Sequence, residues 1–147
     1  MDLKQQLQQD FLAAMKAKEQ ERVGVLRLIR GKIKDLEIDK RRELNPDEVI
    51  GVLMNAAKQR LDSIQAYREG SREDLAAEEE RELVIIKSYL PEQMGPAEIE
   101  KIVIRMIAET GATSMKDIGK VMPKVMAEVK GRANGSEVQA IVRSKLA

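Results

Sequence analysis

The chain has 147 residues, of which 43% are hydrophobic and 35% charged, and its net charge at pH 7 is +1. It contains no cysteine and no histidine, which excludes disulfides, thiolate or imidazole metal sites, cysteine nucleophiles and Ser–His–Asp triads. No apolar run approaches the roughly 20 residues that a membrane span needs, and residues 1–16 lack the apolar core of a secretory signal. We therefore expect a cytoplasmic protein with no membrane partner.

Two amphipathic helices are predicted first, over residues 3–17 and 19–39, because apolar residues recur there at helical spacing. The second of these helices is basic. Its cations mostly suit an ordinary solvated or acid-paired face, and a binding surface is the alternative. The residues concerned are Arg22, Arg30 and Lys34, which can share a face, and Arg27, one turn away.

A third helix has a strong start signal, with Asn45 as N-cap and Pro46 at the first helical position, and it is expected to stop near Gly70. Ser71, with an acid three residues later, predicts the cap of a fourth helix over about 72–88. The acidic run within that helix is expected to be a solvated face.

The segment YLPEQMGP at 89–96 contains two prolines and a glycine, which together break any helix. We therefore expect a boundary there, with one helical subdomain over 1–94 and a second over 95–147. The fold class that follows is all-α, with N-terminal helical hairpins followed by a small C-terminal helical bundle. No stretch alternates polar and apolar residues for long, so no strand is expected.

In the second subdomain, Pro96 opens a helix and Gly111 is expected to end it in the left-handed conformation. Ser114 and the acid three residues later predict a helix start at about 115–122, which Pro123 interrupts or restarts before the chain reaches about residue 129. Ser136 is expected to begin the last helix. Two further glycines, Gly131 and Gly135, are expected to occupy left-handed turn positions.

Charge is unevenly distributed, with +4 over residues 1–42, −6 over 43–95 and +3 over 96–147. The basic ends either pair with the acidic middle or form a surface for an anionic partner. No isolated acid in an apolar context stands out as a general acid or base, no Asp-x-Asp pattern supports a magnesium site, and no cofactor motif is present. We therefore predict no catalytic residue, no metal and no cofactor.

The most distinctive stretch is TSMKDIGKVMPKVMAEVKGRANG at 113–135. Lysines recur there every four residues, which predicts a basic ridge able to contact phosphates, or a plain solvated lysine face. Gly119 either packs closely against a second helix, which we favour, or lets a partner's backbone approach. Gly119-Lys120 is not a phosphate-binding loop, because Ser114 and Val121 stand where that motif needs Gly and Ser or Thr.

Taken together, these segments resemble the GatB/YqeY family, specifically its stand-alone YqeY-like members from bacteria. The resemblance is carried by AMKAKEQERVGVLRLIRGKIKDLEID at 14–39, RRELNPDEVIGVL at 41–53, KQRLDSIQAYREGSREDLAAEE at 58–79, LVIIKSYLPEQM at 83–94 and ETGATSMKDIGKVMPKVMAEVKGRANGSEV at 109–138. It covers the chain almost from end to end.

The resemblance implies that the tail, Pro96–Ala147, is similar to the tail of the B subunit of the glutamine-dependent tRNA amidotransferase, which is held to contact the tRNA body. The chain lacks the amidotransferase's kinase-like body and its zinc ligands, so the family label of carbon–nitrogen ligase with glutamine as amido-N-donor does not transfer as catalysis by this chain alone. We expect an accessory protein that binds tRNA or a tRNA-processing enzyme; the alternative is a protein–protein adaptor with no RNA role. The expected nucleic-acid-binding residues are Lys116, Gly119, Lys120, Lys124, Lys130 and Arg132.

Overall fold

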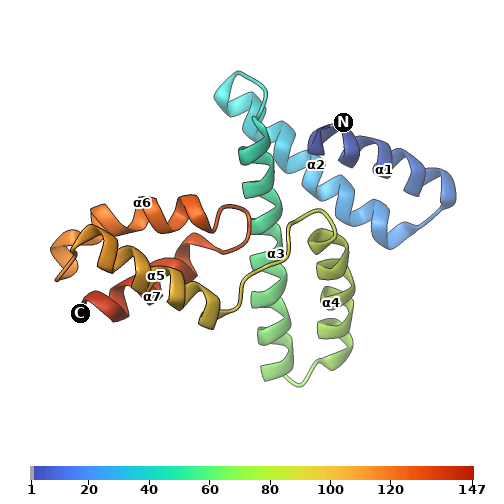
Figure 1. Cartoon of the computed structure of the whole chain (residues 1–147). Helices are drawn as coiled ribbons and strands as arrows, with labels where there is room; N and C mark the ends of the chain where they lie inside the picture. The colour runs from blue at the N-terminus through green and yellow to red at the C-terminus, as the bar shows by residue number, and fades with distance from the viewer. Residues whose placement is uncertain (1) are drawn as a thin grey trace. The chain divides into compact units, whose positions relative to one another are not determined.

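The computed structural model describes residues 2–147, and over that range it consists of seven α-helices and one 3-10 turn with no strand (Figure 1). The predicted all-α class is therefore correct. The chain divides into two compact units, Met1–Pro91 and Glu92–Ala147, each with its own hydrophobic core. The division falls three residues before the expected end of the first subdomain at residue 94.

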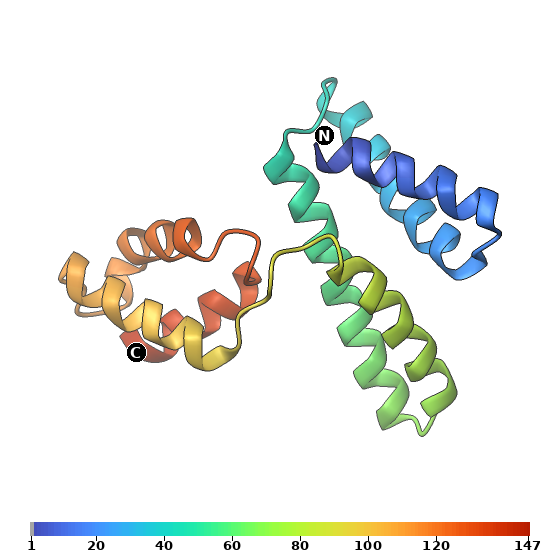
Figure 2. The ribbon, with the colours of Figure 1, turned by 45° about the vertical axis from the view of Figure 1, so that its right-hand side comes forward.

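The N-terminal unit consists of two helical hairpins, α1 (Leu3–Ala17) with α2 (Gln20–Lys40) and α3 (Pro46–Glu69) with α4 (Glu73–Lys87) (Figures 1 and 2). The α4 helix packs mainly along α3 and also contacts α2. All four helices contribute to one core, whose fully buried members include Leu7, Leu26, Leu53 and Ile86.

Local signals set the start of α3 but not that of α4. The Asn45 side chain accepts a hydrogen bond from the Glu48 backbone N–H at 2.9 Å, and the Glu48 carboxylate accepts one in return from the Asn45 N–H. Ser71, by contrast, is not an N-cap, because it has a left-handed φ of 58° whereas a cap needs an extended backbone. It instead closes the turn after α3, where the next residue, Arg72, donates its backbone N–H to the Tyr67 carbonyl at 2.7 Å.

The C-terminal unit contains α5 (Pro96–Thr110), the 3-10 turn η1 (Met115–Asp117), α6 (Ile118–Glu128) and α7 (Gly135–Leu146), and each pair of its three α-helices is in contact (Figure 1). Its core is almost entirely aliphatic. The fully buried members are Ile99, Val103, Val121, Val125, Val129, Val138 and Val142.

Glycine and proline act differently at the ends of these helices. Gly111 ends α5 with φ of 69°, as predicted, whereas Pro123 lies inside α6 without ending it. The last helix begins at Gly135, after Asn134, rather than at Ser136. Gly135 is therefore the first helical residue and not a left-handed turn position, and Gly131, with φ of 75°, supplies that conformation alone within this turn.

Residues 92–94 belong to the C-terminal unit because hydrogen bonds attach them to the turn between α6 and α7. The Met94 N–H donates to the Arg132 carbonyl at 2.8 Å, and the Gln93 amide donates to the Gly131 carbonyl at 2.8 Å. Arg132 Nε donates in turn to the Glu92 carbonyl at 2.9 Å. These three contacts join segments about 40 residues apart, which sequence periodicity cannot reveal.

Candidate nucleic-acid interface

The α6 helix is strongly amphipathic, with one face in the core and the other in solvent. Val121 and Val125 are completely buried and anchor the helix against α5 and α7. The opposite face carries Gly119, Pro123 and Ala127, four residues apart and all exposed. Since residues four apart lie on one side of a helix, these small side chains form a flat stripe along α6.

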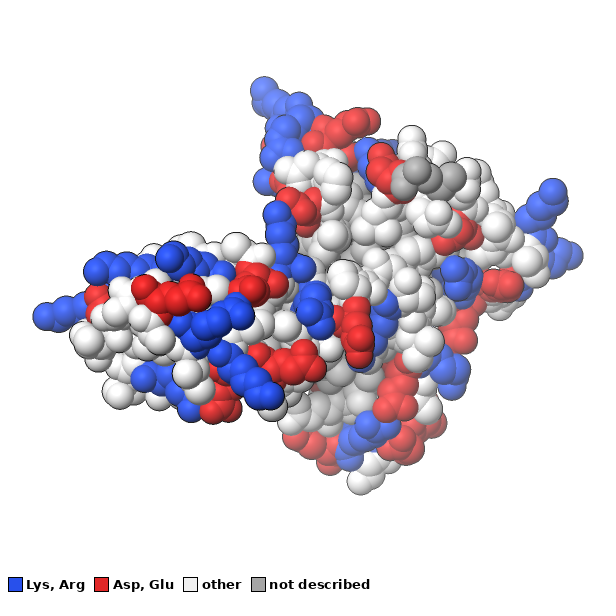
Figure 3. All heavy atoms as spheres, viewed as in Figure 1, with Lys and Arg blue, Asp and Glu red and all other residues white. Residues whose placement is uncertain are grey.

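A row of lysines runs beside this stripe. Lys120 and Lys124 are one helical turn apart on α6, and Lys116 precedes them in η1; all three are exposed. Figure 3 shows Lys and Arg side chains along the side of the C-terminal unit where α6 runs, with acidic side chains close by. We call Gly119, Pro123 and Ala127 together with these three lysines the α6 surface.

Two lysines of the α6 surface have no acidic partner within the described residues. Lys116 and Lys124 form no ion pair there, whereas the Lys120 ammonium lies 3.7 Å from Asp117 Oδ1, on a side chain that is 70% exposed. Other cations of the same unit are paired: Arg105 with Glu128, and Lys145 with Glu100 at 2.8 Å. Both of these ion pairs lie within residues 96–147, so neither is the expected pairing of a basic end with the acidic middle, and Lys116 and Lys124 form no ion pair in the described residues.

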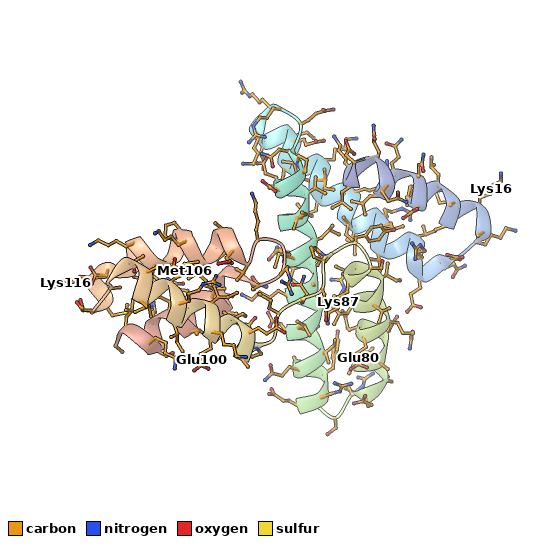
Figure 4. The ribbon with its side chains drawn as sticks, viewed as in Figure 1. Lys16, Glu80, Lys87, Glu100, Met106 and Lys116 are labelled. Atoms are coloured by element: carbon orange, nitrogen blue, oxygen red, sulfur yellow. The ribbon has the colours of Figure 1, made fainter. Side chains whose placement is uncertain are left out.

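The turn before α6 is fixed by a small polar network. Asp117 Oδ2 accepts a hydrogen bond from the Thr113 N–H at 2.9 Å, and this bond lowers the pKa of the carboxyl group. The Ser114 hydroxyl accepts from the Lys116 N–H at 3.3 Å, so Ser114 caps the 3-10 turn as expected. Lys116 consequently lies at one end of the C-terminal unit (Figure 4), at the start of the lysine row.

Gly119 does not have the packing role favoured from sequence. A Cβ added to it would meet no atom within 4 Å, and the residue is exposed. Its carbonyl also cannot receive the usual helical hydrogen bond, because the residue four positions later is Pro123, which has no N–H. The α6 surface thus combines cations with an accessible backbone segment that carries an acceptor free of its normal helical donor.

The other two residues expected at this interface lie outside α6. Lys130 is exposed in the turn after α6. The Arg132 guanidinium holds the Glu92 carbonyl at 2.9 Å and lies 3.9 Å from Glu98, so the structure uses it to attach residues 92–94. For this reason we leave Arg132 out of the α6 surface.

The cations of the basic helix α2 do not all share the surface that was predicted for them. Arg22 does not share a surface with Arg30 and Lys34, because it lies over Tyr89 and Asp10, donating to the Tyr89 hydroxyl at 3.1 Å. Burial first, and the hydrogen bond to Asp10 second, raise the pKa of Tyr89 to about 12. Sequence spacing missed this cluster, because its members come from α1, α2 and the turn after α4, which are far apart in sequence.

Neither a metal centre nor a membrane-spanning helix is present among residues 2–147. No group of three or more acidic, histidine or cysteine side chains there is arranged to hold a metal ion. None of the helices in residues 2–147 is both long and apolar enough to cross a membrane.

Comparison with known proteins gives a consistent result. A family model described as Yqey-like protein matches residues 4–146. Three relatives share the name altered inheritance of mitochondria protein 41, mitochondrial. The protein from Vanderwaltozyma polyspora is 32% identical over 76% of this chain and 64% of its own length. The protein from Pyrenophora tritici-repentis is 27% identical over 95% and 80%, and that from Lachancea thermotolerans 30% identical over 92% and 76%.

The cytoplasmic location expected from the sequence is contradicted by these names, since each relative is described as mitochondrial. The expectation depended on the lack of an apolar N-terminal run. That feature argues only against a secretory signal, because mitochondrial targeting segments are amphipathic and rich in arginine instead.

Proposed function

We propose that this chain, which belongs to the YqeY-like protein family, is an accessory protein that binds structured RNA, with tRNA as its expected ligand, through the α6 surface. The observation that carries this proposal is that Lys116 and Lys124, which form no ion pair in the described residues, lie beside the flat stripe that begins at Gly119. Cations that protein acids do not neutralise are available for phosphates. The small residues let a sugar–phosphate backbone come close to the helix.

The composition of the surface supports a structured RNA rather than splayed single strands. The chain has three aromatic residues, Phe11, Tyr67 and Tyr89, and all belong to the N-terminal unit. A module that binds single strands normally stacks bases on aromatic rings. Recognition by shape, phosphates and the 2′-hydroxyl needs no such ring.

Within this proposal the chain supplies a binding surface and no reacting group. In the described residues burial raises the pKa of Glu79 and of Tyr89, but Glu79 faces Arg60 and the Tyr89 hydroxyl is hydrogen-bonded to Asp10 and Arg22, so both groups are used within the fold. The proposal would be wrong on this point if the purified chain alone converted misacylated tRNA in the presence of glutamine. The link to amide transfer therefore rests on the tail's resemblance to the amidotransferase B subunit.

The test is a fluorescence-polarisation titration of the full chain against folded tRNA at several salt concentrations. We expect micromolar binding that weakens linearly in log–log form with salt. The variant K116E/K120E/K124E should lose at least tenfold in affinity. A variant with the three lysines replaced by glutamine should lower the salt slope by about 2 to 3.

The matched control is K16E/K32E/K87E, which changes the net charge equally. These three lysines are exposed, form no ion pair within the described residues and lie in the N-terminal unit, and two of them are labelled in Figure 4. If the control loses as much affinity as the α6 variant, binding reflects net charge only. Absence of binding at low salt would remove the RNA proposal and leave the adaptor alternative.

A further inference from the structure

A second candidate surface lies in the N-terminal unit, in a groove between α1 and α2. One hollow of about 490 Å³ has a lining that includes Lys4 and Gln8 from α1, Arg27, Arg30, Gly31 and Lys34 from α2, and one acid, Glu37, which is paired with Lys4. A neighbouring hollow of about 380 Å³ shares Arg27 and is lined by Met15, Val23 and Gly24. Because the two share Arg27, they form one track along the hairpin, which we call the α1–α2 groove.

The cations of the groove repel one another and are not neutralised. Arg27, Arg30 and Lys34 are spaced three and four residues apart, so they crowd one side of α2. None forms an ion pair with any described acid, whereas Lys4 at one end is 2.7 Å from Glu37. Like charges at this spacing destabilise a helix, so the cluster indicates a site for a negatively charged partner.

The two guanidinium groups are also held in position. Arg30 lies over the Phe11 ring with 4.6 Å between its Cζ and the ring centroid, and Arg27 lies 5.8 Å from the same centroid. Phe11 is only 9% exposed and therefore fixed in the core. Guanidinium groups ordered on a rigid ring lose little further freedom on binding, and their planar fork suits a carboxylate.

The remainder of the groove suits a helix with an apolar side. Met15 is 48% exposed and Val23 half-buried, and both offer apolar surface that a sugar–phosphate backbone could not use. Gly24 and Gly31 lie two helical turns apart on the same side of α2, and a Cβ at either position would meet no atom within 4 Å. A second helix could therefore approach the α2 backbone closely.

We propose that the α1–α2 groove docks an acidic amphipathic helix of a protein partner. Its carboxylates contact Arg27, Arg30 and Lys34, and its apolar side chains cover Met15 and Val23. The mode is a helix laid into a groove, with charge setting the partner and close packing setting the register. It is independent of the α6 surface, since the two surfaces belong to different units.

The test uses the full chain and a synthetic, dye-labelled helical peptide built from Glu, Leu and Ala, with the Glu and Leu residues on opposite sides. A peptide of the same composition in scrambled order is its control. We expect the amphipathic peptide to bind at least tenfold more tightly than the scrambled one. The variant R27Q/R30Q/K34Q removes the three charges but keeps planar amide groups over Phe11, and its affinity for the amphipathic peptide should fall at least tenfold. The variant K116E/K120E/K124E should bind that peptide normally.

A second variant separates docking from simple charge attraction. In G24A/G31A all cations remain, and alanine strengthens a helix relative to glycine, so this variant should be more stable yet bind the peptide several-fold more weakly. Unchanged affinity in G24A/G31A, or equal binding of the scrambled peptide, would overturn the proposed docking. Displacement of the peptide by an RNA hairpin but not by unlabelled peptide would assign the groove to nucleic acid instead.

Discussion

The hydroxyl of Tyr89 donates a hydrogen bond of 2.6 Å to Asp10 Oδ2, across 79 positions of sequence. It also accepts one from Arg22 Nη2 at 3.1 Å, so a single phenol joins the segment after α4 to both helices of the first hairpin. The carboxylate and the guanidinium lie 3.8 Å apart, too far for a strong hydrogen bond of their own. The hydroxyl therefore bridges an ion pair that is incomplete without it.

Replacing Tyr89 by Phe should destabilise the protein by about 1–2 kcal/mol, because both partners then lose a hydrogen bond in a half-buried place. Urea unfolding at pH 7 measures the change. Tyr67→Phe is the control, since the half-buried Tyr67 makes no hydrogen bond through its hydroxyl in the described residues, and it should cost less than about 0.5 kcal/mol. Equal costs for the two variants would show that the Tyr89 hydroxyl contributes nothing special.

The same phenol predicts an alkaline effect. Its pKa is raised from 10.0 to about 12, chiefly by burial, so the neutral form is favoured in the folded protein. Its contribution is fully present below pH 10 and is lost as the pH rises from 10 to 12. The stability difference between the wild type and Tyr89→Phe should therefore shrink over that range, as measured by urea midpoints, and a constant difference would contradict the assignment.

Glu48 predicts the opposite dependence, at acid pH. Its pKa is lowered from 4.5 to about 2, first by the hydrogen bond from Arg42, with 2.7 Å between Nη1 and Oε1, and then by the Asn45 N–H. The contribution of the carboxylate is present above pH 4.5 and is lost as the pH falls toward 2.

Glu48→Gln isolates this charge, because a glutamine can still complete the capping box. The wild type should be more stable than this variant at pH 7, and the two should converge near pH 2. Thermal unfolding across that range measures the convergence. A difference that stays constant with pH would mean that the cap, and not the charge, stabilises the start of α3.

The free-energy cost of replacing Arg60 should depend on the ionisation of the two carboxylates beside it. The Arg60 Nε lies 2.9 Å from Glu82 and 3.4 Å from Glu79, and the Arg60 side chain is only 14% exposed. Burial, followed by repulsion from Glu82, raises the pKa of Glu79. Arg60→Met should cost about 2 kcal/mol at neutral pH, because two close carboxylates then lose their cation.

The cost of Arg60→Met should fall as the pH drops, since protonation removes the repulsion. It should also be partly reversed by adding Glu79→Gln, which a double-mutant cycle in urea measures. A cost that is the same at pH 7 and pH 4, with no rescue by the second substitution, would assign the effect to packing of the arginine stem instead.

Features set by neighbours within one helical turn could be predicted from the sequence, whereas features set by contacts between distant segments could not. The start of α3 at Asn45 and the end of α5 at Gly111 were predictable, because cap residues act within one turn. Ser71 also has the residue type and the following acid that are typical of an N-cap. The backbone hydrogen bonds that close the turn after α3 nevertheless hold it in the left-handed conformation.

In the candidate sites, too, only the features that depend on neighbours along the helix could be predicted. Spacing alone placed Lys120 and Lys124 on one side of a helix, and Pro123 did not break it. Spacing could not show that Arg132 is used to hold Glu92, or that Arg22 lies over Tyr89, because those partners are distant in sequence. Nor could it show that Gly119 faces solvent rather than a neighbouring helix.

Gly119→Ala tests that last point and the proposed interface together. Gly119 is exposed within α6 and a Cβ there meets nothing within 4 Å, so alanine should raise stability by about 0.5–1 kcal/mol. If RNA approaches the backbone at this position, the added methyl group should weaken tRNA binding several-fold with every lysine retained. Gly51→Ala in α3 is the control, since it is equally unobstructed and should give the stability gain alone. A Gly119→Ala protein that is more stable and binds tRNA as tightly as the wild type would restrict any contact to the lysine side chains.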